Sequence, residues 1–156
     1  MLSAEEKQEM DEELRHHEHR QGACIEALKI VQRSRGWVSD ESIRDIADHI
    51  GMPAEELDGV ATFYNSIFRK PVGRHVIYVC ESVTCWIKNV DSIRAQLSAR
   101  LGIDYGGTTK DNLFTLLPVQ CLGTCDHAPA LMVDGELYRD LTPERIDEIL
   151  ERYRTA

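Results

Sequence analysis

The first part of the chain repeats apolar residues at helical spacing. Two segments, 22–35 and 40–50, do so and each is followed by a glycine, Gly36 or Gly51. The inward positions are Ala23, Ala27, Leu28 and Val31 in the first segment and Ile43, Ile46, Ala47 and Ile50 in the second. These patterns predict two amphipathic helices.

Two further helices flank this pair. Residues 3–20 are very polar and open on Ser3 with Glu6 three positions later, the S-x-x-E capping box of a helix N-terminus. Pro53 suits the first turn of another helix, which leads into the aromatic run that begins at Phe63. We therefore predict a helical bundle as the N-terminal domain, over residues 1–70.

The pattern changes at residues 70–73 (KPVG), where turn-forming residues precede the β-rich run HVIYVC at 75–80. A helix over 89–101 and a strand over 113–119 are predicted next, which gives the order β, α, β. A βαβ unit makes its two strands parallel. The domain boundary is placed at this change of pattern, with the second domain over residues 71–156.

A hairpin and a helix complete the predicted second domain. The segments 130–133 and 136–138 flank Asp134-Gly135, a dipeptide that favours a type I′ turn, and Thr142 with Pro143 starts the last helix. This is the thioredoxin-like order, in which a cis proline precedes the third strand, and we expect a cis bond at Pro129. The predicted fold class is α/β (α+β), a helical bundle followed by a thioredoxin-like domain.

Composition narrows the class of partner. The chain has 156 residues, 42% of them hydrophobic, and a formal charge of -9. That charge would repel nucleic acid and anionic lipid surfaces. No run approaches the 18 or so apolar residues of a membrane span, and the acidic N-terminus does not resemble a signal peptide. We therefore expect a cytoplasmic location.

The cysteines are the strongest chemical signal. Cys80 and Cys85 form C-x4-C, Cys121 and Cys125 form C-x3-C, and 35 residues separate the pairs. Both pairs are predicted where a strand ends and a loop begins, so parallel strands would bring the two loops side by side. The small or polar neighbours Ser82, Thr84, Gly123 and Thr124 leave backbone N–H groups free to point at sulfur.

Spacing alone does not choose the metal. Four thiolates can hold either an iron–sulfur cluster or a structural zinc ion, and we weigh the two equally at this point. A thioredoxin-type dithiol requires C-x-x-C, which the chain lacks. Four unconnected buried thiols fit the paired placement less well.

Four segments together resemble a known family. They are EALKIVQRSRGWV (26–38), GVATFYNSIFRKPVGRHVIYVCESVTC (59–85), VQCLGTCDHAPALMVDGELY (119–138) and LTPERI (141–146). They resemble the thioredoxin-like [2Fe-2S] subunit of the NADH-dehydrogenase module of bacterial respiratory complex I, an NADH:quinone oxidoreductase. The resemblance spans roughly residues 20–153 and includes the helical part, which stand-alone thioredoxin-like ferredoxins do not match.

The resemblance implies a role as well as a fold. It implies one [2Fe-2S] cluster on Cys80, Cys85, Cys121 and Cys125, with one iron on each pair. It also implies that FMN and NADH bind a partner subunit, that the helical part packs on that subunit, and that a further iron–sulfur subunit belongs to the same complex. The complex would hold the chain at the inner membrane, and the chain would relay single electrons with no substrate site of its own.

Other residues are assigned simpler roles. We interpret Cys24 as a small buried hydrophobe, His16, His17 and His19 as a solvated helix face, and His127 as lying outside the ligand set. Trp37, Phe63, Tyr64, Phe68 and Trp86 are predicted to be core or subunit-interface residues. Gly106-Gly107 is no nucleotide fingerprint, because no G-x-G-x-x-G opens a helix in the chain.

Three alternatives remain open on the sequence. The same cluster could serve the small subunit of a soluble NAD-linked hydrogenase or formate dehydrogenase, the thiols could hold zinc in an interaction module, or the chain could be a free ferredoxin. If the cluster is present, Glu81 and Asp126, which directly follow ligands, should disfavour its reduction, and amides of the 121–125 loop should favour it.

Overall fold

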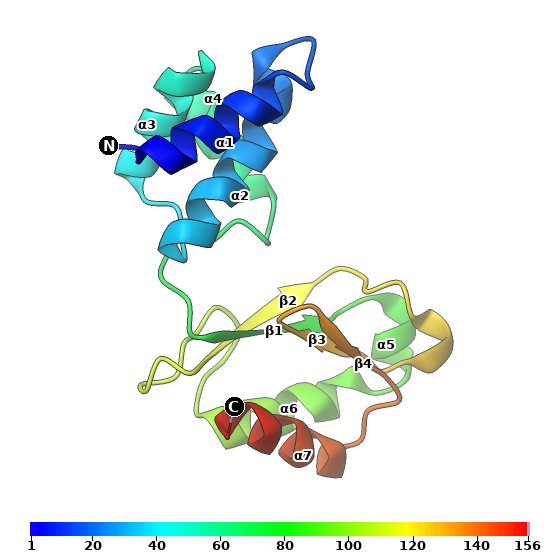
Figure 1. Ribbon diagram of the computed structural model, residues 1–156. Coiled ribbons are helices and arrows are strands. Elements are labelled where there is room, and N and C mark those ends of the chain that lie inside the picture. The colour runs from blue at the N-terminus through cyan, green and yellow to red at the C-terminus, as the bar shows by residue number, and fades with distance from the viewer. Residues whose placement is uncertain (156) are drawn as a thin grey trace. The chain divides into compact units, whose positions relative to one another are not determined.

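The computed structural model describes residues 1–155 and divides into two compact units, Met1–Pro71 and a second unit that begins at Val72. The first unit is helical and the second is built on a four-stranded sheet (Figure 1). The predicted fold class, a helical bundle followed by a thioredoxin-like domain, is confirmed. Among the described residues no helix combines the length and the apolar character that a membrane span requires.

The helical unit follows the apolar pattern closely. Its elements are α1 (Ala4–Leu14), the 3₁₀ helix η1 (Arg20–Ala23), α2 (Cys24–Arg35), α3 (Asp40–Ile50) and α4 (Ala54–Phe63). All eight inward positions predicted for the segments 22–35 and 40–50 are buried. Gly36 and Gly51 end α2 and α3 in the left-handed conformation, at φ 81° and 71°, as glycine does without a Cβ penalty.

The first helix confirms its predicted start and corrects its predicted end. The Ser3 hydroxyl accepts the Glu6 amide at 3.1 Å, and the Glu6 carboxylate accepts the Ser3 amide at 2.8 Å, so the capping box is present. The helix ends at Leu14 rather than at residue 20. Leu14 is the last buried position, and a helix with no apolar face left to pack has little to stabilise it in water.

The sheet of the second unit has the order β2-β1-β3-β4. Its strands are β1 (His75–Cys80), β2 (Phe114–Val119), β3 (Leu131–Val133) and β4 (Glu136–Tyr138). Strands β1 and β2 are parallel, from His75 opposite Phe114 to Cys80 opposite Val119, and β3 pairs antiparallel with both β1 and β4. The parallel pairing predicted from the βαβ order is therefore present.

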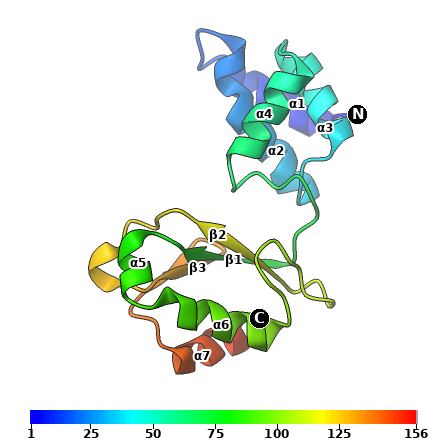
Figure 2. The ribbon, with the colours of Figure 1, turned by 180° about the vertical axis from the view of Figure 1, so that it is seen from behind.

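Two long helices cover one face of this sheet. They are α6 (Val90–Leu101) and α7 (Pro143–Arg154), which lie side by side in both ribbon views and pack on each other (Figures 1 and 2). Between the helices and the sheet lies an apolar core that includes Ile77, Leu116, Leu131 and Ile146, each fully buried. Burial of each such side chain contributes about 1.5–3 kcal/mol.

The hairpin and the proline match their predictions. Asp134 and Gly135 both have positive φ, 49° and 91°, as a type I′ turn requires. The Asp134 carboxylate also accepts the Val76 amide at 2.9 Å, which ties the turn to β1. The Ala128–Pro129 bond is cis, as expected.

Candidate iron–sulfur site

The parallel strand pair sets the cysteine loops beside each other. Cys80 is the last residue of β1 and lies opposite Val119, the last residue of β2, so Cys121 follows two residues beyond the same edge. The Glu81 amide donates to the Val119 carbonyl at 2.8 Å, and the Cys80 Sγ lies 4.0 Å from the Gln120 carbonyl oxygen. Both loops therefore leave the sheet at one place.

Cys85 and Cys125 are held by short helices that the sequence analysis did not predict. Cys85 lies in α5 (Val83–Ile87) and is buried, and Cys125 starts the 3₁₀ helix η2 (Cys125–His127). The expectation that both pairs lie in plain loops is wrong for these two residues. One helical turn brings the Cys85 thiol into contact with Cys80 and the Cys125 thiol into contact with Cys121.

The second pair has the geometry of two ligands on one metal. The Sγ atoms of Cys121 and Cys125 lie 3.9 Å apart. Two thiolates on one tetrahedral metal, with bonds of about 2.3 Å, would lie about 3.8 Å apart. The Gly123 amide donates to the Cys121 Sγ at 3.3 Å, which confirms that a backbone N–H in this loop points at sulfur.

The two pairs also touch each other. The pKa of Cys121 is lowered, first by the Gly123 amide and then by the Cys125 thiol, and contacts with Ser82 and Cys80 lower it further. The pKa of Cys125 is raised by its hydrogen bond with Cys121, while Thr84 acts in the opposite direction. Ser82 and Thr84, next to the first pair, thus contact the thiols of the second.

Burial is the largest influence on the pKa of Cys85. Removal from water and, second, contact with Cys80 raise the pKa of Cys85 to about 11, against the opposing effect of the Ala130 amide. Within residues 1–155 no three His, Cys, Asp or Glu side chains are arranged around a point that would hold a single ion. The cysteines form two linked pairs instead.

The polar groups around the four cysteines suit a cofactor whose sulfur atoms accept hydrogen bonds. Thr124 is 7% exposed and its hydroxyl oxygen is buried with no hydrogen-bond partner in the described part of the chain. A buried hydroxyl without a partner is costly, and cluster sulfur between the loops would accept a hydrogen bond from it. The thiols, the Gly123 and Ala130 amides and this hydroxyl together fit an anionic iron–sulfur cluster.

Comparison with known proteins decides the family. The model of the thioredoxin-like [2Fe-2S] ferredoxin family matches residues 10–154. The chain belongs to this family. Its membership extends through most of the helical unit as well as the sheet domain.

Relatives of the chain include subunits of NADH-quinone oxidoreductase. The chain is 53% identical over 153 residues to the E-type subunit of NADH-quinone oxidoreductase from Escherichia coli K12, a match that covers 98% of this chain and 92% of the relative. It is 49% identical over the same length to the protein of that name from Pseudomonas aeruginosa, with the same coverage. The resemblance stated from the sequence is confirmed.

A solved structure shares the fold. A crystal structure of an NAD+-reducing [NiFe]-hydrogenase matches 85% of this chain with a TM-score of 0.72 and 24% identity. The match occupies 23% of the hydrogenase chain, so the chain spans a small part of that protein's length. At this identity the likeness concerns the fold.

The His127 ring contacts two carboxylates. Its Nδ1 lies 2.8 Å from an Asp140 carboxylate oxygen, and its Nε2 lies 3.5 Å from Asp126. Cys24 is half-buried against the core of the helical unit, in the other unit from the four cysteines. His16 and His19 are exposed and His17 is half-buried.

The exposure of the five aromatic residues decides between the core and interface roles expected for them only as far as the core is concerned. Phe63, Tyr64 and Trp86 are exposed, and Trp37 and Phe68 are half-buried, so none of the five is a core residue. A largely exposed tryptophan or phenylalanine buries little apolar area and so contributes little to the stability of its own fold. The interface role remains a prediction for them.

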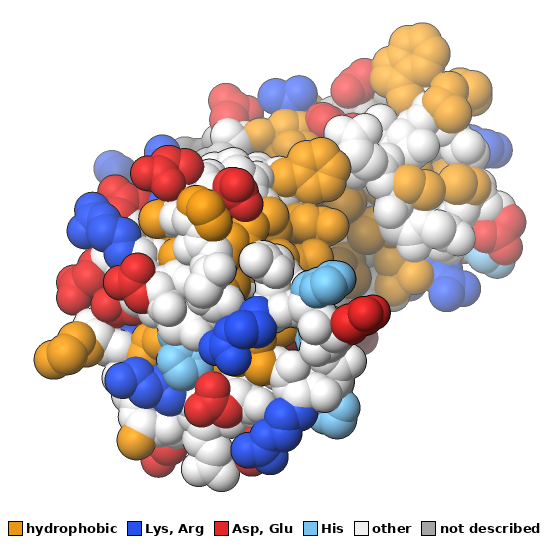
Figure 3. Space-filling view, turned by 90° about the horizontal axis from the view of Figure 1, so that it is seen from above, with side chains coloured by type: hydrophobic (Ala, Val, Ile, Leu, Met, Phe, Trp, Pro, Cys, Tyr) orange, Lys and Arg blue, Asp and Glu red, His pale blue; other side chains and the backbone are white. Residues whose placement is uncertain are grey.

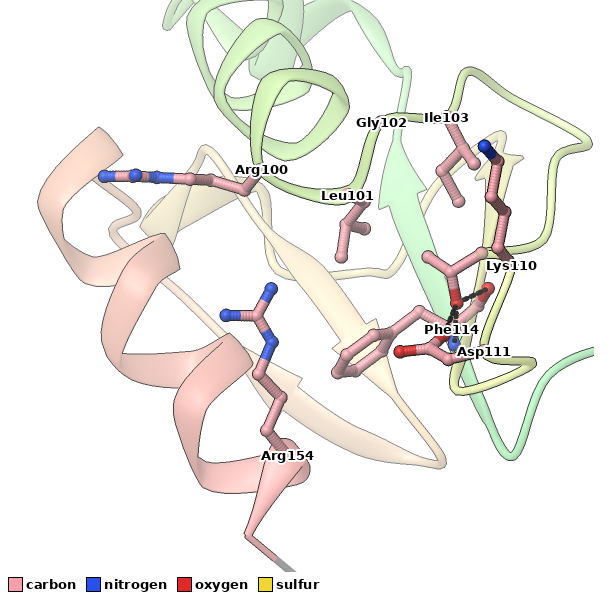
Figure 4. A pocket seen from close by; sticks show the side chains of 9 residues that line it. Arg100, Leu101, Gly102, Ile103, Lys110, Asp111, Phe114 and Arg154 are labelled. Carbon is pink, nitrogen blue, oxygen red and sulfur yellow. Dashed lines mark hydrogen bonds between the residues drawn. The ribbon is translucent and has the colours of Figure 1, made fainter.

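A pocket of about 460 Å³ lies at the other end of the sheet from the cysteines (Figure 4). Phe114, the first residue of β2, lines it together with Arg100, Lys110 and Arg154. Arg100 is paired with Asp147, and the arginines stand in the last turns of α6 and α7, where cations offset the helix dipoles. The positions of the two arginines have a structural explanation, and the pocket has no part in the thiol site.

Proposed function

We propose that this chain is the E-type subunit of an NADH-quinone oxidoreductase, with one [2Fe-2S] cluster on Cys80, Cys85, Cys121 and Cys125. The observation that carries the proposal is the convergence of two cysteine pairs at one end of a parallel strand pair, in a chain that is 53% identical to relatives of that name. When bound, the cluster supplies a one-electron redox site.

The residues of this chain would hold the cluster and set its environment. Cys121 and Cys125 would bind one iron, and Cys80 with Cys85 the other. The amides of Gly123 and Ala130 already face thiol sulfur and would favour the more negative, reduced state. The strands fix the loops, so the ligands need little rearrangement when an electron arrives or leaves.

The rest of the electron path belongs to partners. NADH and FMN would bind a flavoprotein subunit, which exchanges single electrons with this chain, and a further iron–sulfur subunit would carry electrons toward quinone. The complex would hold this chain on the cytoplasmic side of the inner membrane. The NAD+-reducing hydrogenase shares the fold, and its 24% identity does not favour that role here.

Spectroscopy with metal analysis tests the proposal. The purified chain should contain two irons and no zinc, absorb in the visible range, and give an electron paramagnetic resonance signal after dithionite that is absent before. A colourless chain with one zinc would overturn the electron-carrier role and support a zinc-stabilised interaction module. A loaded chain that runs alone on gel filtration of the native cell extract would indicate a free ferredoxin.

A further inference from the structure

The turn that carries Cys125 is weakly anchored by its own residues. It is the 3₁₀ helix η2, three residues long, closed by a hydrogen bond from the His127 amide to the Thr124 carbonyl at 3.0 Å. All three of its residues are exposed. Cys80, by contrast, lies in the ladder of β1, and Cys85 is buried. Because a single 3₁₀ turn is a poor support, the position of the Cys125 thiol depends on contacts from outside the turn.

Such contacts come from the segment between β4 and α7. The Asp140 amide donates to the His127 carbonyl at 2.9 Å, and the Leu141 amide donates to the Pro129 carbonyl at 3.1 Å. The side chains meet as well, because the His127 Nδ1 lies 2.8 Å from an Asp140 carboxylate oxygen. Leu141 is 5% exposed and belongs to the apolar core of the sheet domain. Residues 139–141 thus connect the cysteine-bearing turn to that core.

The backbone of Asp140 adopts a conformation that suits this contact. Its φ is 48°, in the left-handed region that residues other than glycine rarely adopt and that aspartate and asparagine tolerate best. In that conformation Asp140 binds His127 twice, through its amide and through its carboxylate. The His127 ring donates from Nδ1, and its Nε2 lies 3.5 Å from the carboxylate of Asp126, on the same turn.

A surface pair of this kind is by itself weak evidence for a function. Acidic and basic side chains are interspersed over the face drawn in Figure 3, and exposed pairs contribute little to stability. The His127 and Asp140 side chains are 48% and 62% exposed. Their place distinguishes them, because the pair lies two residues from Cys125 and joins the same two segments as the backbone bonds. Its effect should therefore appear at Cys125 rather than in the stability of the whole fold.

We propose that His127 is a positioning residue, whose hydrogen bond to Asp140 fixes η2 and thereby the Cys125 thiol for cluster binding. This role rests on the proposed function, because Cys125 must be a cluster ligand. The segment that follows η2 also presents the Ala130 amide to the Cys85 thiol, so its position affects both cysteine pairs. With the pair broken, η2 moves more, and a thiolate that leaves its iron more often lets the iron escape faster.

Release of iron from the cluster-loaded full chain to excess EDTA, followed by the loss of visible absorption, tests the inference. His127→Ala and Asp140→Gly each remove one partner of the bond, and glycine accepts the positive φ, so each should speed iron release roughly threefold. The double variant should release iron no faster than the faster single variant, because both substitutions remove the same bond. Asp140→Asn keeps an oxygen acceptor and should stay near the wild-type rate.

The helical unit offers a matched control, where the His49 Nε2 lies 2.9 Å from an Asp11 carboxylate oxygen. His49→Ala should leave iron release unchanged. The electron paramagnetic resonance lines of reduced His127→Ala should be broader than those of the wild type and of Asp140→Asn. A merely structural role would change the stability of the fold and leave these lines as they are.

Wild-type iron release in both His127→Ala and Asp140→Gly would overturn the positioning role and leave the four proposed ligands standing. Additive effects in the double variant would show that the two side chains act separately, and would overturn the pair as the cause. A wild-type chain that takes up no iron would instead overturn the proposed function, and the positioning role with it.

Discussion

The Glu81 carboxylate, directly after Cys80, contacts the hydroxyl of Tyr105. Burial raises the pKa of Tyr105, and the charge of Glu81 with that contact raises it further, so the phenol stays protonated and can donate. The Arg94 guanidinium lies 4.4 Å from the centre of the Tyr105 ring. Glu81 is thus held in place beside Cys80, one of the four proposed cluster ligands.

Because a fixed negative charge opposes addition of an electron, Glu81→Gln should raise the midpoint potential of the cluster, by an amount on the order of tens of millivolts. Tyr105→Phe keeps the carboxylate and removes its hydrogen-bond donor, so it should lower the potential. A redox titration followed by electron paramagnetic resonance measures both. No shift, or a fall, in Glu81→Gln would show that this carboxylate does not set the potential.

The buried Thr124 hydroxyl leads to a second prediction about the midpoint potential of the cluster. If it donates to cluster sulfur, the bond strengthens on reduction, and Thr124→Val should lower the midpoint potential by roughly 40 mV, equivalent to about 1 kcal/mol. Thr124→Ser keeps the hydroxyl and should stay near the wild-type value. Equal potentials in the valine and serine variants would show that the hydroxyl does not reach the cluster.

Acid stability of the helical unit should depend on Glu6. This carboxylate accepts two hydrogen bonds from Arg35, at 2.8 and 2.6 Å, and one from Ser34 at 2.6 Å. The Arg35 bonds, helped by Ser34, lower the Glu6 pKa from 4.5 to about 2. A lowered folded-state pKa stabilises the protein above pH 4.5, and the stabilisation is lost as the pH falls through 2.

Glu6→Gln should therefore lower the free energy of unfolding at pH 7 by roughly 3 kcal/mol, with the difference from wild type shrinking below pH 4. Urea denaturation followed by circular dichroism at several pH values measures it. Glu9→Gln, at an exposed glutamate 3.4 Å from Arg33, is the matched control and should change stability by less than about 0.5 kcal/mol. A pH-independent difference would contradict the electrostatic cause.

The sequence predicts correctly those elements whose residues restrict the conformation of the backbone. Asp134-Gly135 tolerates the two positive φ angles of a type I′ turn, and the apolar faces of α2 and α3 have one way to be buried. The sequence predicts too long a helix α1, because Ser3 and Glu6 mark where a helix begins while the polar residues after Leu14 mark no end. Helix propensity alone does not locate the C-terminal end of α1.

The sequence predicts that the two cysteine pairs follow parallel strands, which the structure confirms, and it misses the local structure around Cys85 and Cys125. Paired cysteines after parallel strands are visible in the spacing, but the residues VTCWI of α5 include two β-branched residues before the cysteine and make one helical turn. Such a turn is stabilised by tertiary contacts rather than by its own sequence. The exposure of Trp86 likewise depends on which side of that turn faces the core, and spacing over five residues does not determine it.

Iron content in single cysteine variants is the sharpest test of a cluster held by four thiolates. Alanine at Cys80, Cys85, Cys121 or Cys125 should each abolish the [2Fe-2S] spectrum, because alanine offers no ligand to replace the thiolate. Cys24→Ala, at the chain's remaining cysteine, should keep two irons and an unchanged spectrum. A loaded cluster that survives loss of any of the four thiols, or one that disappears with Cys24, would contradict this set of ligands.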